Sequence, residues 1–283
     1  MPSISLPVQD PALPLGKESH YPQGYDPSLL YSIPRSLGRE MIGVNATALP
    51  FIGWDQWRAY ELSWLNLKGR PQVGLLSVRV PATSTCIVES KSLKLYLNSL
   101  NNERFSSATD LRQVIESDLS RAFDAPTDVT ICEPDQFGNE RIDEQGLGEC
   151  LDDIDIEIDA YQPDARLLKV IGTSSVVAEE VFTRLLKSNC PVTGQPDWGC
   201  LQIKYEGPAI DHASVLRYVV SFRQHQGFHE QCVEQLFCDI LSRCQPHRLS
   251  VYARYTRRGG LDINPWRATP GMPEPSLQRS AQQ

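Results

Sequence analysis

Apolar positions along the chain recur first with the two-residue period of strands and then with the spacing of helices. In the first half, this pattern predicts strands over 60–66 and 71–80, helices over about 89–100 and 109–123, and strands over 127–133 and 154–161. In the second half, it predicts strands over 181–189 and 200–207, a helix over about 213–224, a second helix and a strand over 249–256. Val233, Leu236, Phe237, Ile240 and Leu241 form the apolar stripe of that second helix. Both halves therefore read strand–strand–helix–helix–strand.

Residue matches between the halves indicate an internal duplication. Ser92, Tyr96, Ser99 and Leu100 align with Ser214, Tyr218, Ser221 and Phe222, in that order. The turn 69–72 (GRPQ) aligns with 194–197 (GQPD) in the same way. Two copies are few for a repeat signal, but the shared element order strengthens it. We predict an α+β protein in which each half packs antiparallel strands against two helices.

The two ends of the chain show little periodicity. Residues 1–40 are rich in proline, and the last stretch is rich in proline, serine and glutamine, which is typical of segments that fray. We therefore predict an extended arm over 1–40, a first module over 41–164, a second module over 165–268 and a flexible tail over 269–283.

Composition narrows the class of protein. A net charge of −8 gives no overall attraction to nucleic acid or to anionic lipid. No apolar run approaches the roughly 18–20 residues of a membrane span, and the first residues lack the basic start and apolar core of a signal peptide. We expect a cytoplasmic protein, in which the eight cysteines are free thiols.

The common nucleotide and metal motifs are missing from the sequence. It contains no complete G-x-G-x-x-G, no P-loop and no C-x-x-C, and Val233 stands where an H-E-x-x-H motif needs its second histidine. Cys232, Cys238 and Cys244 recur every six residues, a spacing that rotates around a helix, so we interpret them as buried, inert thiols.

Cys190 is the cysteine whose surroundings suggest chemistry. It ends an apolar strand and enters the turn SNCPVTGQPDWG, where a hairpin would bring Asp197 to the same place. A thiolate attacks electrophiles and a nearby carboxylic acid donates a proton, although an aspartate that only caps the loop fits the spacing as well. His229 and Glu230 follow a glycine at a predicted helix start, where an acidic first turn is also the ordinary reading.

Further polar residues lie at the matching helix start of the first half and in one basic cluster. Glu89, Ser90 and Lys91 begin the predicted helix of the first half. The run 254–260 (RYTRRGG), with Arg267 beyond it, either binds a ligand phosphate or is a solvated strand end. Each half holds chemical groups that the other lacks, as if one site drew on both copies.

Four segments together resemble the long, two-module form of the QueF family, the NADPH-dependent reductases of 7-cyano-7-deazaguanine on the route to the tRNA nucleoside queuosine. These segments are ESKSLKLYLNS (89–99), SNCPVTGQPDWG (188–199), SFRQHQGFHEQCVE (221–234) and YARYTRRGGLDINPWR (252–267). The resemblance covers nearly the whole chain. It implies tandem tunnelling-fold modules that assemble, and we expect a homodimer. It also implies a purine nitrile as substrate, two NADPH per turnover and no metal.

The resemblance also implies a role for individual residues. Cys190 would add to the nitrile carbon to give a covalent thioimide, Asp197 would supply a proton, and His229 would contact the substrate beside the reaction centre. The remaining substrate-binding residues would be Val88, Glu89, Ser90, Phe228 and Glu230, the two glutamates accepting from the donor edge of the deazaguanine. The residues that grip NADPH would be Ser90, Lys91, Arg258 and Gly259.

Two other functions remain open at this point. A zinc-dependent, cyclohydrolase-like enzyme of the same fold would use Cys190 and His229 as ligands, and metal analysis would reveal it. A purine- or pterin-binding module without catalysis would bind without oxidising NADPH, although the chain keeps both Cys190 and Asp197.

Overall fold

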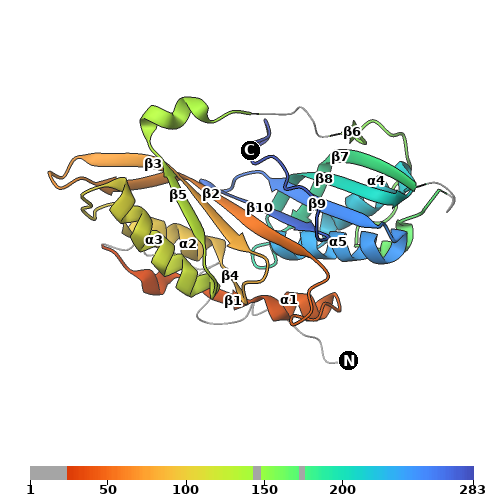
Figure 1. Cartoon of the computed structure of the whole chain (residues 1–283), viewed down its shortest axis with the longest axis horizontal. Coiled ribbons are helices and arrows are strands. Elements are labelled where there is room, and N and C mark those ends of the chain that lie inside the picture. Colours follow the sequence, from red (N-terminus) through yellow and green to blue (C-terminus); the bar gives the residue numbers. More distant parts are fainter. Residues whose placement is uncertain (1–23, 143–147, 172–175) are drawn as a thin grey trace. The chain divides into compact units, whose positions relative to one another are not determined.

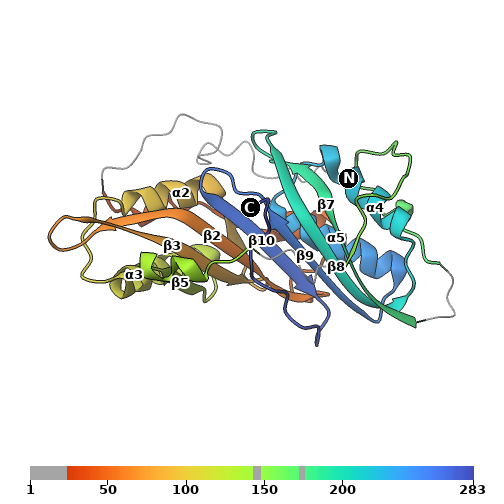
Figure 2. The same cartoon turned by 90° about the horizontal axis from the view of Figure 1, so that it is seen from above.

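The computed structural model describes residues 24–142, 148–171 and 176–283, which form two compact units. The N-terminal unit comprises the described residues up to Thr47, Trp54–Arg141 and Arg257–Ile263. The C-terminal unit comprises Ala48–Gly53, Ile142–Thr256 and Asn264–Gln283. Each unit has strands on one side and two helices packed against them (Figures 1 and 2).

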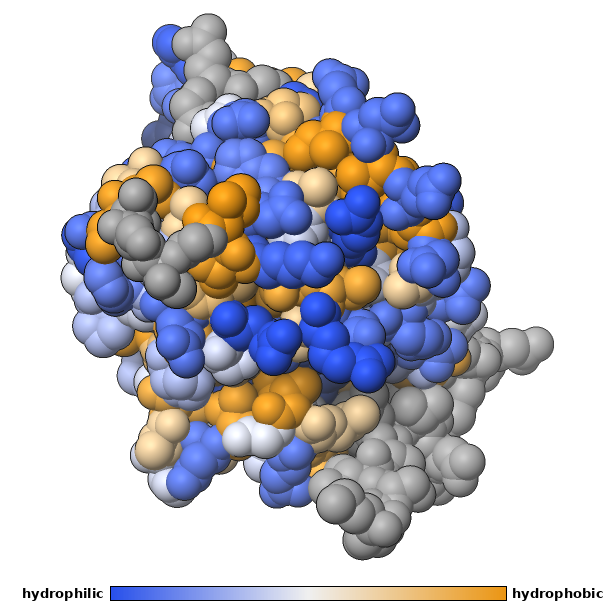
Figure 3. Space-filling view, turned by 90° about the vertical axis from the view of Figure 1, so that its right-hand side faces the viewer, coloured by the Kyte–Doolittle hydropathy of each residue, from blue (hydrophilic) through white to orange (hydrophobic). Residues whose placement is uncertain are grey.

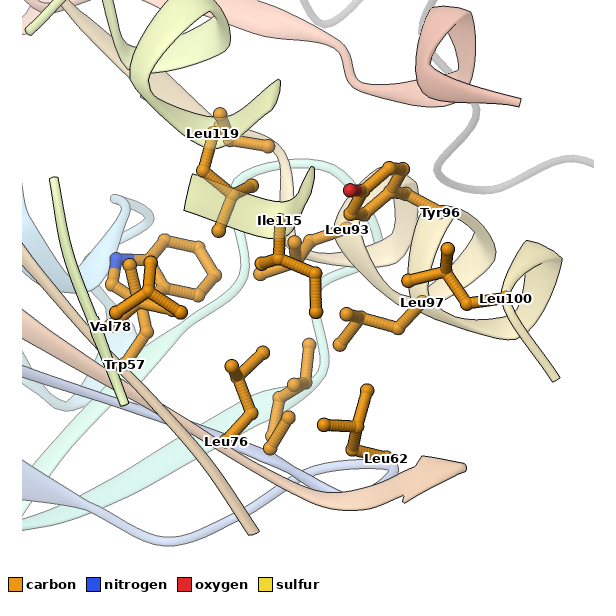
Figure 4. Close-up of a cluster of buried hydrophobic side chains, with 14 of the residues drawn as sticks. Trp57, Leu62, Leu76, Val78, Leu93, Tyr96, Leu97, Leu100, Ile115 and Leu119 are labelled. Atoms are coloured by element: carbon orange, nitrogen blue, oxygen red, sulfur yellow. The ribbon is translucent and has the colours of Figure 1, made fainter. Parts of the chain in front are cut away.

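The N-terminal unit is built on antiparallel strands in the order β5-β3-β2, with a separate pair β1-β4. Its elements are η1 (Pro27–Leu29), β1 (Ser32–Pro34), α1 (Arg35–Met41), β2 (Ile52–Leu65), β3 (Pro71–Pro81), β4 (Cys86–Val88), α2 (Ser90–Ser99), α3 (Ala108–Phe123), β5 (Asp128–Cys132) and η2 (Pro134–Asn139), of which β2 begins in the C-terminal unit. Side chains of α2 and α3 point at side chains of β2 and β3, as the labelled residues of Figure 4 show. Burial of this apolar cluster holds the helix pair on the strands.

The C-terminal unit repeats that plan with strands in the order β10-β9-β8-β7-β6. Its elements are β6 (Glu149–Cys150), η3 (Ala165–Leu167), β7 (Val176–Asn189), β8 (Pro196–Pro208), α4 (His212–Ser221), η4 (Phe222–Gln224), α5 (His229–Cys244), β9 (Arg248–Tyr255) and β10 (Leu261–Ala268), of which β10 begins in the N-terminal unit. Neighbouring strands are antiparallel, except that the two-residue strand β6 runs parallel to β7. Four of the five residues of the predicted apolar stripe on α5 are buried, and Leu241 is half-buried.

The predicted α+β class, with antiparallel strands backed by a helix pair in each half, is confirmed. Equivalent hydrogen bonds support the duplication as well. The hydroxyl of Tyr96 donates to Asp118 at 2.7 Å, and that of Tyr218 donates to Asp239 at 2.5 Å. Irregular pairing interrupts the two long hairpins at matching places, between Ala59 and Leu62 and, 124 positions later, between Thr183 and Leu186.

The repeat extends further towards the N-terminus than the predicted module boundary at residue 41. Asp26 caps η1, and Asp164 caps η3 in the same way. The backbone amide of Tyr31 then donates to the hydroxyl of Ser92, and that of Lys169 donates to Ser214, both at 3.0 Å. Part of the predicted extended arm is therefore the first element of the first repeat, and only residues 1–23 of it lie outside the described residues.

Two other segments differ from the sequence predictions. Residues 154–160 keep the alternation of half-buried isoleucines with exposed acids, but they pair with no strand among the described residues, so the strand predicted there is wrong. Burial of every second residue requires only that one side of the segment packs on an apolar surface. It does not require hydrogen bonds to a neighbouring strand. Where a fraying tail was expected, Met272, Ser280 and Gln283 are buried in the C-terminal unit.

The surface and the helices agree with the composition. On the face shown in Figure 3, hydrophilic residues gather across the middle, with hydrophobic residues between them. Within the ranges that the structure describes, none of the helices combines the length and the hydropathy that crossing a membrane requires. All eight cysteines are free.

Candidate active site

Cys190 lies at the tight turn between β7 and β8. Its amide donates to the carbonyl of Gln195 at 2.8 Å, and its carbonyl accepts from the amide of Gly194 at 3.0 Å. Gly194 has φ +68°, which a residue without Cβ adopts at little cost, so the turn can close. Cys190 is only 3% exposed, which keeps it out of bulk water.

The pairing of β7 with β8 brings Asp197 to the same end of this hairpin. Asp197 is opposite Ser188, two residues before Cys190, and is 3% exposed. In the N-terminal unit, Gln72 takes the equivalent place opposite Trp64. The register thus confirms the alignment of Gln72 with Asp197, and the carboxylic acid is present in the second repeat alone of the two.

His229 joins this group from the start of α5. The amide of Asn189 donates to the carbonyl of His225 at 2.8 Å, and the amide of Gly227 donates back to Asn189 at 3.2 Å, so the segment before α5 lies along the end of β7. Nε2 of His229 is 3.4 Å from Oδ1 of Asp197. The structure therefore brings together the predicted acid, the predicted histidine and the turn that carries the cysteine.

Phe228 and Glu230 flank His229. Phe228 precedes the helix, and its amide donates to Oε1 of Gln231 at 3.2 Å. This hydrogen bond gives a partner to a backbone amide at the N-terminus of α5. Glu230 is 2% exposed in the first turn, where the helix dipole favours a negative charge. Both the capping role and a ligand-binding role fit this placement.

Val88, Glu89 and Ser90 lie in the N-terminal unit, where β4 ends and α2 begins. The carboxylate of Glu89 caps α2 by accepting from the amides of Lys91 at 2.7 Å and Ser92 at 2.8 Å. Glu89 is fully buried, and this burial raises its pKa, although the hydrogen bonds from Lys91, Ser92 and Ser90 act in the opposite direction. Asp211 caps α4 at the equivalent position of the second repeat.

Of the residues predicted to bind the cofactor, Gly259 lies beside helix α2 of the N-terminal unit. A Cβ added to Gly259, which has φ +56°, would meet Nζ of Lys94. Lys94 lies three residues after Lys91 on α2, and Arg258 precedes Gly259 in the loop that Lys94 contacts. Glu61 lies against Gly260 and is the acidic neighbour of this loop. A close-approach loop with lysine and arginine beside it fits a ligand that carries phosphates.

Two arginines of the basic cluster predicted from the sequence (residues 254–260 and Arg267) are buried, so the cluster is smaller than expected. Arg267 is fully buried and pairs with Glu234 at 2.9 Å, and Arg254, 3% exposed, donates to the carbonyl of Gln278. Both belong to the interior of the C-terminal unit. Arg257 lies over the ring of Tyr60, 3.8 Å from its centroid, in the N-terminal unit.

Sequence reasoning missed two residues near these groups. Tyr255 stacks on His229 from the end of β9, and Lys94 contacts Gly259. The three-residue spacing from Lys91 could have revealed Lys94. The sequence gives no comparable indication for Tyr255, because an aromatic residue on a strand predicts burial but does not predict which side chain it will contact.

The described residues include a group that fits acid-assisted thiol chemistry. Among them, no group of three or more His, Cys, Asp or Glu side chains is arranged to hold a metal ion. A buried thiol, a buried carboxyl and an imidazole at one end of a hairpin can add sulfur to an electrophile and move a proton.

The chain is similar to known proteins over nearly its whole length. Residues 21–131 match the family described as "Nitrile reductase, 7-cyano-7-deazaguanine-reductase N-term", and residues 196–273 match the family of QueF-like proteins. A protein of Burkholderia multivorans named "NADPH-dependent 7-cyano-7-deazaguanine reductase" is 54% identical over 95% of this chain and 98% of its own length. One with the same name from Bordetella avium is 51% identical over 98% of this chain and 100% of its own length. A crystal structure of an apo archaeosine synthase QueF-Like matches 36% of this chain and 100% of that chain, at 18% identity and a TM-score of 0.31.

Proposed function

Because the chain belongs to the QueF family of nitrile reductases, we propose that it reduces 7-cyano-7-deazaguanine to 7-aminomethyl-7-deazaguanine with NADPH, as a step towards queuosine. Reduction of a nitrile to a primary amine consumes two hydrides and two protons. NADPH, when bound, supplies the hydrides, so each turnover consumes two NADPH. The observation that supports the chemistry best is the end of the β7–β8 hairpin, where Asp197 lies 3.4 Å from His229 beside the turn of Cys190.

Cys190 is the nucleophile of this proposal. Its sulfur forms a bond to the nitrile carbon while one π bond of the nitrile breaks and the nitrogen takes up a proton, which gives a thioimide. A protonated thioimide accepts hydride far better than a free nitrile does. The carbon–sulfur bond breaks after the first reduction, which returns the thiolate and leaves an imine for the second.

Asp197 and His229 handle the protons. Asp197 donates a proton as the nitrile nitrogen gains charge, and His229, in contact with its carboxyl group, orients the carboxyl and touches the substrate. The thiol, carboxyl and imidazole all lie in poorly exposed positions, which limits hydrolysis of the imine.

Substrate and cofactor residues are proposed on the same basis. Glu89 and Glu230 accept hydrogen bonds from the donor edge of the purine, with Val88, Ser90 and Phe228 as further contacts. Ser90, Lys91, Arg258 and Gly259 bind NADPH, and Lys94 adds a cation beside Gly259. No metal takes part. We also propose a cytoplasmic homodimer that does not bind nucleic acid.

The assay for the proposed function measures how many NADPH molecules are oxidised for each molecule of product formed. Purified protein, 7-cyano-7-deazaguanine and NADPH should yield the aminomethyl product with two NADPH oxidised per product. Purine binding without NADPH oxidation would indicate a binding module without catalysis. Activity that disappears with EDTA and returns with zinc would indicate the zinc-dependent enzyme.

A further inference from the structure

Tyr255, the last residue of β9, lies flat on the imidazole of His229. The ring centroids are 3.8 Å apart, and the planes differ by 5°. Tyr255 is fully buried and also lies against Gly199, where a Cβ would come within 3.2 Å of its Cδ1. The strand register pairs Gly199 with Tyr255, and the missing side chain lets the ring approach the backbone of β8.

Hydrogen bonds fix the backbone of Tyr255 on both sides. Its amide donates to Oδ1 of Asn264 at 3.1 Å, and its carbonyl accepts from Nε2 of Gln283 at 3.2 Å. The same Nε2 donates to Oδ1 of Asn264 at 2.7 Å, and the amide of Ser280 donates to Oε1 of Gln283 at 3.0 Å. All four residues are buried, so this network operates with little competition from water.

We propose that Tyr255 is a positioning residue that sets the plane of the His229 imidazole, and that Asn264 and Gln283 hold Tyr255 in place. This inference rests on the proposed function, in which His229 contacts substrate. A histidine on an exposed helix start would rotate about its side-chain bonds, whereas a parallel ring at 3.8 Å restricts it to one plane with Nε2 facing Asp197.

The hydroxyl and the ring of Tyr255 make separable contributions. Positioning depends on the ring, so Tyr255→Phe should retain kcat within about threefold. Tyr255→Leu removes the flat surface and should lower kcat by roughly 10–100-fold, the loss expected when a catalytic group is misplaced by up to about 1 Å. The KM for the nitrile should change by less than about threefold in both variants, because the proposal assigns Tyr255 a contact with His229 and none with the substrate.

Tyr205→Leu is the matched control for loss of a buried tyrosine in the same unit. Tyr205 lies on β8, and its hydroxyl contacts Glu179 and the amide of Ile210, away from His229. Rates are normalised to the folded fraction measured by purine binding. If Tyr255→Leu does not fold, Gln283→Ala serves instead, and it should lower kcat about two- to fivefold by loosening the Tyr255 backbone.

A spectroscopic readout tests the stacking without reference to turnover. In protein with labelled histidine, the ring current of Tyr255 should shift the ring protons of His229 to high field, with the signal assigned by its loss in His229→Asn. Tyr255→Phe should keep that shift, Tyr255→Leu should abolish it, and Tyr205→Leu should leave it unchanged. A His229 signal that stays the same in Tyr255→Leu, or a wild-type kcat in that variant, overturns the inference. Failure of the wild-type protein to oxidise NADPH would instead overturn the proposed function, and the shift would still report on the stacking.

Discussion

Substitution of Asp197 by asparagine isolates the proton that the proposed mechanism needs. Asparagine has nearly the same shape, so β8 and its register with Ser188 should persist. In the wild-type protein, Oδ1 of Asp197 lies 3.4 Å from Nε2 of His229. The asparagine amide can still contact Nε2, but it cannot donate a proton as an acid does. The variant therefore separates proton donation from the packing of this buried position.

The expected loss follows from the scale of general acid catalysis. A positioned acid contributes roughly 10²–10⁴-fold, which corresponds to about 2.7–5.4 kcal/mol at 1.36 kcal/mol per tenfold change. Because Asp197 is 3% exposed, water has little access to take over its role, so the loss should lie towards the larger end of that range. The dissociation constant of the purine should change by less than about threefold, since the glutamates are assigned to its donor edge.

The assay measures two rates on the same protein. Intact mass after rapid quenching gives the rate of covalent addition without NADPH, and NADPH oxidation gives turnover. Asp152→Asn is the control, because Asp152 is a partly buried carboxylate of the same unit that accepts from Thr183 and Arg184. A wild-type addition rate in Asp197→Asn, or a loss of purine binding as large as the loss of rate, would refute the assignment of Asp197 as the acid.

The other predictions concern capping, charge and pH. Glu89→Gln should raise the KM for the purine by roughly 10–100-fold, the worth of a charge-assisted hydrogen bond, while Asp211→Asn, which alters the matching cap, should leave that KM unchanged in steady-state assays. Lys94→Met should raise the KM for NADPH by roughly 3–30-fold without changing that for the purine, while Lys68→Met in the same unit should change neither. Burial raises the pKa of Asp239 above its value in the unfolded chain. The contribution of Asp239 to the free energy of unfolding is therefore present below about pH 4 and is lost as the pH rises through the pKa of the folded state. Urea titrations at several pH values should show a flatter pH dependence in Asp239→Asn than in the wild-type protein. Dialysis against EDTA should leave turnover unchanged, and a loss restored by zinc would contradict the metal-free mechanism.

Much of the fold was predictable because it depends on local spacing. The apolar stripe of α5 and the two hairpins follow from period and turn chemistry, and the match of Tyr96 with Tyr218 proved to be a repeated hydrogen bond to an aspartate. The strand predicted over 154–161 failed, because alternation reports burial and not pairing. The first repeat element at Asp26 was overlooked, since η1 is one short turn with no periodicity to detect.

The candidate site was predictable only in part. Register could be inferred for Cys190 and Asp197, because one hairpin joins them. The stacking of Tyr255 on His229 could not be predicted, because β9 and the start of α5 are brought together by tertiary packing. The same limit explains Arg267, which reads as part of a basic cluster until its buried partner, Glu234, is seen.

The covalent adduct tests the central claim most directly. Protein mixed with 7-cyano-7-deazaguanine in the absence of NADPH should gain the mass of one substrate per chain, and addition of NADPH should discharge it. Cys190→Ala should form no adduct while still binding the purine, and Cys200→Ala, which removes another buried thiol of the same unit, should form it normally. An unmodified wild-type mass under conditions where the purine binds, or an adduct that persists in Cys190→Ala, would contradict the assignment of Cys190 as the nucleophile.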